Sequence, residues 1–172
     1  MRHDPLADPA PLIRRVYSYV AYRIGDGPEA EDVTSEVFER ALRYRGSYDE
    51  SRGRPVAWLL GIARRCVDDA LSARPRTSPT DSADIAADSD VGTDVERRVM
   101  LAAAIGTLDE HARDLLALRY GADLTARQIG EILGMRANTV EVALHRTLAR
   151  LRHELGEPPR RTDSRTPSTS SQ

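Results

Sequence analysis

The sequence predicts an all-α protein made of two small helical domains joined by a flexible linker. Of the 172 residues, 40% are hydrophobic and only 5% aromatic, and aliphatic helix formers dominate. Hydrophobic residues recur three and four positions apart, whereas runs of alternating β-branched residues are missing from the sequence. A polar segment rich in Pro, Ser, Thr and Asp separates two blocks that follow this helical pattern.

The first block, residues 8–74, contains three predicted helices. The opening helix, 11–25, stops at a glycine, and the second begins at Pro28, a residue that suits the first helical position. The second helix ends near residues 45–46, a polar loop follows, and Pro55 begins a third helix that reaches about residue 71. We expect one core to be formed by the apolar positions of these helices: Ile13, Val16, Tyr17, Val20, Ile24, Val33, Val37, Phe38, Ala41, Leu42, Trp58, Leu59, Ile62, Cys66 or Val67, Ala70 and Leu71.

Two further segments have almost nothing to bury. Residues 75–93 form the predicted flexible acidic linker, and residues 157–172 have the composition of a disordered tail. The second domain is therefore expected over residues 94–156.

The second block ends in a predicted helix-turn-helix. Thr125 can cap a helix, and Gln128 three residues later completes a capping box. Gly130 is small where a crossing helix must approach closely, and Gly134 lies where the chain must leave the helix with a left-handed backbone. A second helix begins near Ala137, and its core face holds Val140, Leu144, Thr147, Leu148 and Leu151. This spacing predicts a DNA-docking motif, with a plain αα-hairpin as the alternative.

The opposite face of the second helix is the predicted DNA-contacting surface. Asn138 can pair with an adenine edge and Glu141 can accept from cytosine, whereas Arg146 and Arg150 suit phosphates. For single residues, above all Glu141 and His145, a solvated helix surface is the alternative. The predicted contact residues are Arg136, Asn138, Thr139, Glu141, Val142, His145 and Arg146.

Composition narrows the function classes. The net charge of −2 disfavours tight non-specific DNA binding by the chain alone. A single cysteine, Cys66, excludes an internal disulfide and a cysteine-based zinc cluster, and we read it as a small core residue. The four histidines are scattered, and no phosphate-binding glycine loop or nucleophile elbow appears, so we expect neither an enzyme nor a metal or other cofactor. No stretch has the apolar length of a signal peptide or membrane span, which predicts a cytoplasmic protein without membrane contact.

Three segments together carry a family resemblance. "EAEDVTSEVFERAL", then "YDESRGRPVAWLLGIARRCVDDAL", then the helix-turn-helix resemble the extracytoplasmic-function (ECF) sigma factors, which consist of region two, a linker and region four. The resemblance covers about residues 11–155 in the expected order. It implies an alternative sigma factor that binds RNA polymerase core and directs promoter-specific transcription initiation. A stand-alone helix-turn-helix regulator is the alternative, although it leaves residues 29–65 unexplained and predicts a dimer.

The resemblance also implies roles for residues of the first domain. Its acidic helix would bind the clamp helices of the polymerase β′ subunit through Glu31, Asp32, Glu36 and Phe38, unless these acids only serve the helix dipole. The loop and the helix after it resemble the part that melts the −10 element and captures an extruded base. Trp58 could stack there, but its spacing favours the core. The −10 candidates are Tyr48, Asp49, Ser51, Arg52, Arg54, Arg64 and Arg65.

By the same resemblance, the partners are polymerase core (the β′ clamp helices and β), promoter DNA and an anti-sigma factor. The linker is either a passive tether or a segment that enters the RNA-exit path. One departure concerns the helix expected to meet the −35 element, where family members often carry Lys-Ser-Arg and this chain has Glu141, Val142 and Ala143. Fewer cations mean fewer phosphate contacts, so we expect weaker intrinsic −35 binding.

Overall fold

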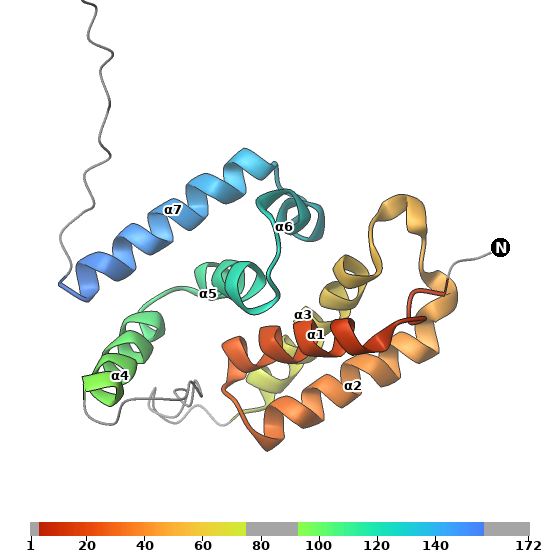
Figure 1. Cartoon of the computed structure of the whole chain (residues 1–172), viewed down its shortest axis with the longest axis horizontal. Coiled ribbons are helices and arrows are strands. Elements are labelled where there is room, and N and C mark those ends of the chain that lie inside the picture. Colours follow the sequence, from red (N-terminus) through yellow and green to blue (C-terminus); the bar gives the residue numbers. More distant parts are fainter. Residues whose placement is uncertain (1–3, 75–92, 157–172) are drawn as a thin grey trace, which may run out of the picture.

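The computed structural model describes residues 4–74 and 93–156, and all regular secondary structure in these ranges is helical (Figure 1). This confirms the predicted fold class. The first domain consists of α1 (Pro9–Ile24), α2 (Pro28–Tyr44), two short 3₁₀ turns, η1 (Arg45–Ser47) and η2 (Glu50–Arg52), and α3 (Pro55–Ala73). The second consists of α4 (Thr93–Gly106), α5 (Glu110–Leu116), the π-helical segment η3 (Ala117–Gly121), α6 (Ala126–Leu133) and α7 (Ala137–Glu154). The predicted tail lies outside the described residues, as does the predicted linker except Thr93, which begins α4.

Most of the predicted core of the first domain is buried, for example Val16, Val37 and Leu59. Two predicted core positions are wrong, because Ile13 is 44% and Leu42 57% exposed. In α1 the buried stripe runs instead through Tyr19, because α1 packs against η3 of the second domain as well as against α2 and α3. Leu42 lies in the last turn of α2, directly after buried Ala41, at the edge of the apolar stripe.

The helix-turn-helix has the geometry that its sequence predicts. The backbone N–H of Thr125 donates to Gln128 Oε1 at 2.9 Å, and the N–H of Gln128 donates back to Thr125 Oγ1 at 3.3 Å, which completes the capping box. Gly134 ends α6 with a φ of +67°, in the left-handed region. At Gly130 the close neighbour is the turn itself and not a crossing helix, since a Cβ there would lie 2.4 Å from the carbonyl oxygen of Met135.

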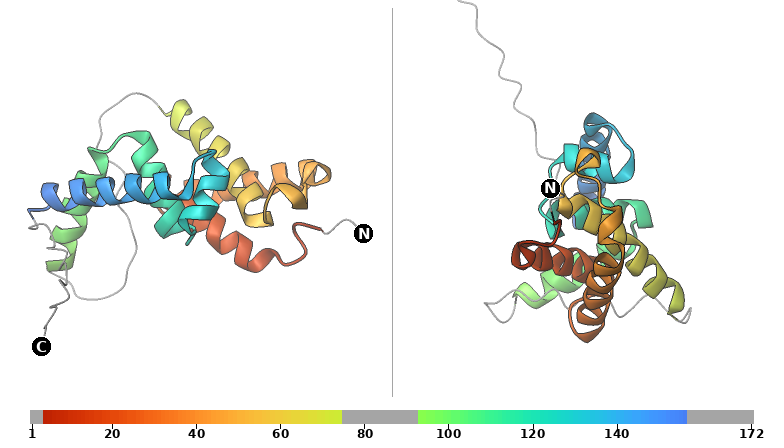
Figure 2. Two further views of the ribbon diagram at one scale, coloured as in Figure 1. Left: turned by 90° about the horizontal axis from the view of Figure 1, so that it is seen from above. Right: turned by 90° about the vertical axis from the view of Figure 1, so that its right-hand side faces the viewer.

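The two domains share a continuous buried core. Helix α1 packs against η3, and α3 packs against α6, so that the second domain lies along the first (Figures 1 and 2). In the second domain, Leu118, Leu124 and Ile129 are fully buried. Within the described residues, no helix has the length and apolar character to cross a membrane.

Candidate nucleic-acid interface

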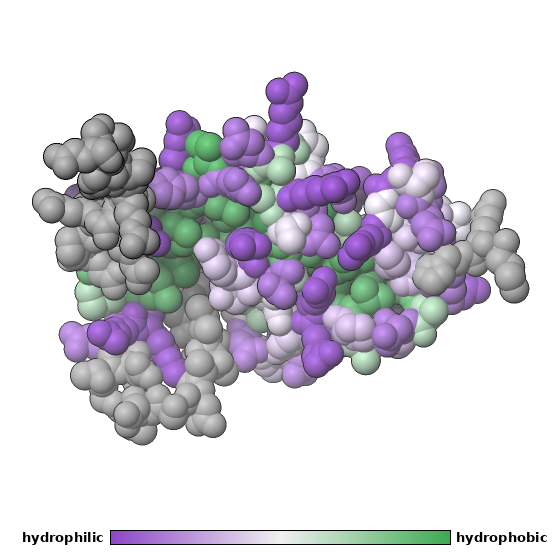
Figure 3. Space-filling view, turned by 45° about the horizontal axis from the view of Figure 1, so that its top comes forward, coloured by the Kyte–Doolittle hydropathy of each residue, from purple (hydrophilic) through white to green (hydrophobic). Residues whose placement is uncertain are grey.

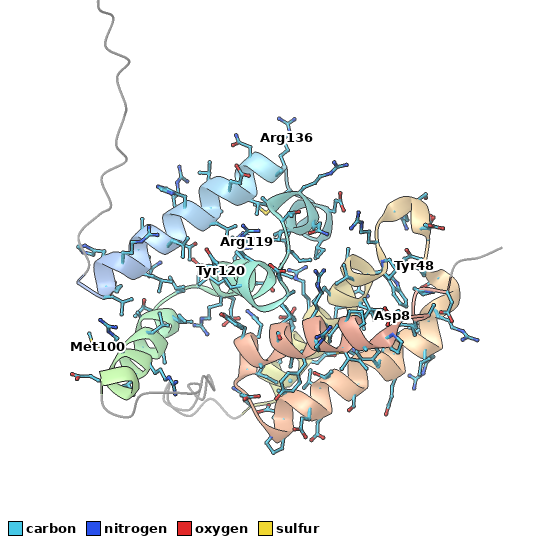
Figure 4. The ribbon with its side chains drawn as sticks, viewed as in Figure 1. Asp8, Tyr48, Met100, Arg119, Tyr120 and Arg136 are labelled. Carbon is cyan, nitrogen blue, oxygen red and sulfur yellow. The ribbon has the colours of Figure 1, made fainter. Side chains whose placement is uncertain are left out.

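The exposed face of α7 carries all the residues predicted to contact DNA through the helix-turn-helix. Each of the seven is exposed, and Val142 is the exposed large hydrophobic residue among them, at 42%. Arg136 directly precedes α7 and points away from the body of the molecule (Figure 4). The buried side of α7 holds Val140, Leu144, Thr147 and Leu151, as predicted, with Leu148 partly buried. The helix thus presents one polar face and one apolar face.

The polar face of α7 is not uniformly basic. Glu141 is exposed on it together with Arg136 and Arg146. Arg150 is exposed and donates to the carbonyl oxygen of Thr107 at 2.9 Å, which ties α7 to the residues after α4. Hydrophilic side chains cover much of the surface on the side where α7 comes forward (Figure 3).

Three of the predicted −10 residues give the loop between α2 and α3 its shape. Asp49 Oδ1 accepts from the backbone N–H of Ser51 at 3.0 Å and from its hydroxyl at 2.7 Å. These hydrogen bonds hold the pKa of Asp49 below its usual range. Tyr48 Oη donates to the carbonyl oxygen of Gly53 at 3.0 Å. The loop is therefore held by its own polar side chains.

Beside this loop lies a pocket of about 350 Å³, which we call the loop pocket. Tyr48 and Trp58 form an aromatic pair in its wall, with ring centroids 5.6 Å apart and planes tilted by 60°. Trp58 is also partly buried against the core, as its spacing predicts. The lining residues are Ser47, Tyr48, Asp49, Arg52, Gly53, Ala57, Trp58, Gly61, Ile62, Arg65, Glu131 and Ile132.

The pocket brings together some of the −10 candidates and leaves others out. Tyr48, Asp49, Arg52 and Arg65 line it, whereas Ser51, Arg54 and Arg64 do not. Arg54 is the residue that precedes α3 as its N-cap. The second domain contributes too, because Glu131 and Ile132 belong to α6. The predicted base-capture region thus faces the helix-turn-helix.

Arg64 is part of a contact between the domains that sequence reasoning missed. Its Nε donates to Asp114 Oδ2 on α5 at 2.7 Å, and Tyr19 Oη donates to Asp114 Oδ1 at 2.6 Å. Burial, and then the Asp114 carboxylate, raise the pKa of Tyr19 far above its ordinary value. A second pair joins Arg23 Nη2 to Glu110 Oε2 at 2.9 Å. The sequence spacing of α1 could have placed Tyr19 on an inner face, but it holds no signal for a partner 95 residues away.

The acidic surface of α2 is largely open to solvent. Glu31 and Asp32 are exposed at the start of this helix. Glu36 pairs with Arg40 at 2.5 Å, and Arg40 also reaches Asp69 of α3 at 3.0 Å. Phe38 is half-buried against the core. Of the four predicted polymerase-binding residues, two are thus fully available and two also serve the fold.

The described part of the chain contains no cluster of three or more His, Cys, Asp or Glu side chains that could hold a metal ion. Cys66 is buried, and its burial raises the pKa of the thiol. A raised thiol pKa lowers the fraction of reactive thiolate, which suits a residue packed in the core.

Comparison with known proteins identifies similar chains. Residues 11–77 match the family model of Sigma-70 region 2, and residues 104–153 match that of Sigma-70 region 4. The chain is 34% identical over 165 residues to the ECF RNA polymerase sigma factor ShbA of Streptomyces griseus subsp. griseus, covering 87% of this chain and 85% of that protein. It is 30% identical over 152 residues to the ECF RNA polymerase sigma factor SigK of Mycobacterium sp. strain KMS, covering 83% of this chain and 78% of that protein.

Two solved structures share the fold. One is CnrH in complex with the cytosolic domain of CnrY, with a TM-score of 0.59 and 20% identity over 85% of this chain and 80% of the other. The second is the sigma factor RpoE in complex with the anti-sigma factor NepR from Bartonella quintana, with a TM-score of 0.58 and 17% identity over 84% of this chain and 92% of the other. Both confirm the arrangement of helices.

Proposed function

This chain belongs to the ECF sigma factors of RNA polymerase, and we propose that three separate surfaces of it bind core polymerase, the −10 element and the −35 element. A sigma factor binds polymerase core and directs promoter-specific initiation. We propose that residues 8–74 act as region two and residues 94–156 as region four, joined by residues 75–93. Because the polymerase works on chromosomal DNA, we place this activity in the cytoplasm. The chain would act by recruiting the polymerase to promoters and not by catalysis.

The polymerase surface is the acidic start of α2. Glu31 and Asp32 are exposed there, which supports a contact with a basic partner such as the β′ clamp helices. Glu36 is oriented by Arg40, and Phe38 adds apolar area beside it. Since the anti-sigma factor NepR accompanies the sigma factor RpoE in its solved complex, we also propose an anti-sigma partner for this chain.

The −10 surface is the loop pocket. Separated DNA strands are bound by aromatic rings, on which bases stack, and by cations that hold the phosphates. The Tyr48–Trp58 pair supplies rings and Arg52 and Arg65 supply cations around a pocket of about 350 Å³, large enough for a flipped base. Asp49 and Ser51 act here by holding the loop in shape.

The −35 surface is the exposed face of α7, and this is the observation that carries the proposal. All seven predicted contact residues are exposed, six on the second helix of the helix-turn-helix and Arg136 directly before it. The motif has a complete capping box and a left-handed Gly134. Glu141 and Val142 limit the affinity of this face for phosphates. Tethering through the polymerase compensates, because the second contact forms at a high effective concentration.

Reconstitution with purified bacterial core polymerase tests the proposal. The wild-type chain is expected to bind core and to initiate transcription on members of a genomic promoter library. Asp32→Arg should weaken core binding by roughly tenfold, as charge reversal at a complementary surface does. Glu96→Arg, which reverses an exposed acid on α4, is the matched control and should bind as the wild type does. Equal binding of both variants would contradict the assignment of the α2 surface, and no binding of the wild type would favour a stand-alone regulator.

A further inference from the structure

The contact between the two domains is centred on a buried carboxylate. Asp114 of α5 has a side chain that is only 7% exposed, and both of its oxygens are used by the first domain. One accepts from Tyr19 of α1 and the other from Arg64 of α3, at 2.6 and 2.7 Å. Hydrogen bonds to a charged group in a site of low polarity are strong. The carboxylate thus ties α1 and α3 to α5.

The backbones of the two domains also approach closely near this contact. A Cβ on Gly121 of η3 would lie 2.9 Å from the carbonyl oxygen of Ser18 on α1. A backbone oxygen cannot move aside as the end of a flexible side chain can. Any side chain at residue 121 would therefore push the second domain away from α1.

This packing masks part of the proposed −10 surface. Arg64 is a −10 candidate, yet its guanidinium is held by Asp114. Glu131 and Ile132 of α6 line the same pocket as Arg52 and Arg65. Movement of the second domain would free Arg64 Nε for a DNA phosphate and would uncover the side of the loop pocket that α6 lines.

Promoter geometry requires the same movement. Elements named −10 and −35 lie about 25 base pairs apart, which is roughly 85 Å along B-form DNA at about 3.4 Å per base pair. Domains that pack α3 against α6 cannot reach both elements. Residues 75–92 are the covalent connection between α3 and α4, so separation of the domains breaks no described helix.

We propose that Asp114 is an intramolecular substitute for DNA phosphate, which occupies Arg64 and holds the free sigma factor in an autoinhibited, closed arrangement. The inference rests on the proposed −10 role of Arg64 and the loop pocket. Polymerase core and promoter DNA bind the separated domains. The apparent affinity of the free chain for either partner is then the affinity of the open form multiplied by the fraction of molecules that are open.

Two variants of the full chain test this closed arrangement by different means. Asp114→Asn removes the charge while keeping the size of the side chain, and Gly121→Ala adds one methyl group against Ser18 without changing any charge. Asp69→Asn is the matched control, because Asp69 is 65% exposed and pairs with Arg40 inside the first domain. Circular dichroism shows whether each variant retains its helices.

The variants and the wild type are then compared by two measurements. Small-angle X-ray scattering gives the radius of gyration, and fluorescence anisotropy gives the affinity for a random-sequence single-stranded DNA 20-mer. We expect both test variants to have a larger radius of gyration, and Asp114→Asn to bind the oligonucleotide roughly tenfold more tightly, as the loss of a charged hydrogen bond suggests. Combining Asp114→Asn with Arg64→Ala should cancel this gain. The control should match the wild type in both measurements.

The proposal is overturned if the radius of gyration of both folded variants equals that of the wild type. It is equally overturned if the variants expand but bind the oligonucleotide no better, because the contact then inhibits nothing. A failure of the proposed −10 site has a different signature. Holoenzyme with Arg52→Ala would then initiate as well as the wild type, whatever the scattering result.

Discussion

The two proposed DNA-reading surfaces differ in how far their side chains are available. Asn138 and Arg146 on α7 are exposed, as is Arg136 directly before it. In the first domain, Asp49 and Ser51 are hydrogen-bonded to each other, Arg64 is paired with Asp114, and the loop pocket is lined in part by α6. The proposed −35 surface is thus open to solvent, whereas the proposed −10 surface is in part engaged in contacts within the chain.

The difference lies in what supports each surface. The exposed face of α7 depends on the apolar side of the same helix and on the turn before it, so its outer residues can change without loss of the fold. In the first domain, by contrast, some of the predicted DNA-contacting residues also hold the structure: Asp49 and Ser51 shape the loop, and Arg64 joins the two domains. Substitutions on α7 should therefore act on DNA binding alone, and substitutions around Asp114 should act on stability as well.

The largest effect should come from the support of the α7 surface. Gly130→Ala places a methyl group 2.4 Å from the carbonyl oxygen of Met135, so the turn between α6 and α7 must shift. Overpacking against backbone of this kind costs about 3 kcal/mol of the free energy of unfolding. Urea unfolding of the full chain measures it. The control is Gly106→Ala, where an added Cβ meets nothing within 4 Å, and equal losses in both variants would refute the argument.

The next effect concerns the domain contact. Tyr19→Phe removes the hydroxyl that donates to Asp114 at 2.6 Å in a buried site, and we expect a loss of about 2 kcal/mol in the free energy of unfolding. Tyr17→Phe is the matched control, because its hydroxyl donates to Asp26 in an exposed setting and should contribute well under about 1 kcal/mol. A larger loss in the control would show that burial of the contact does not matter.

The same residue gives a pH dependence. The pKa of Tyr19 is raised in the folded chain, chiefly by burial, above its ordinary value of 10.0. Its contribution is therefore fully present below pH 10.0 and falls as pH rises further, because the unfolded chain then loses a proton that the folded chain keeps. The stability difference between wild type and Tyr19→Phe should narrow above this pH. Denaturant unfolding over a pH series measures it.

Local patterns predicted the architecture well. Pro28 and Pro55 at helix starts, the Thr125–Gln128 capping box, Gly134 and the core face of α7 all act within one or two turns of chain, and the structure confirms each. The predicted start of the first helix at residue 11 is wrong by two residues, because α1 begins at Pro9. The acidic start of α2 and the exposed face of α7 follow from the same periodicity. Which residues lie on the exposed face of a single helix could therefore be predicted from the sequence.

Contacts between residues far apart in the sequence could not be predicted in this way. Tyr19 and Asp114 are 95 residues apart, and nothing in the sequence around either one specifies the other. From the sequence, Arg64 cannot be distinguished from an arginine that binds DNA, and only the placement of α5 in the structure shows that it pairs with Asp114. The exposure of Ile13 has a similar cause, because the second domain changes which side of α1 is buried.

A moderate effect is expected on the exposed face of α7. Asn138→Ala removes a side chain that can pair with an adenine edge, and the loss of such a contact lowers promoter binding by roughly tenfold. The fold and the affinity for core polymerase should not change, because the side chain is exposed. Promoter-specific transcription and core binding are measured side by side, with His153→Ala near the end of α7 as control. Equal losses in transcription and core binding would contradict a DNA-reading role.

The smallest effect is a gain and not a loss, because it should raise the affinity of the exposed face of α7 for DNA phosphates. Glu141→Arg replaces an exposed acid on α7 by a cation that can reach a phosphate. One added phosphate contact should tighten holoenzyme binding to promoter DNA a few-fold at low salt and steepen the slope of log affinity against log salt by about 0.9. Glu154→Arg makes the same charge change at the other end of α7 and should leave the slope unchanged. If both variants steepen it alike, net charge and not the position on α7 governs binding, and the exposed face would lose its claim to the −35 element.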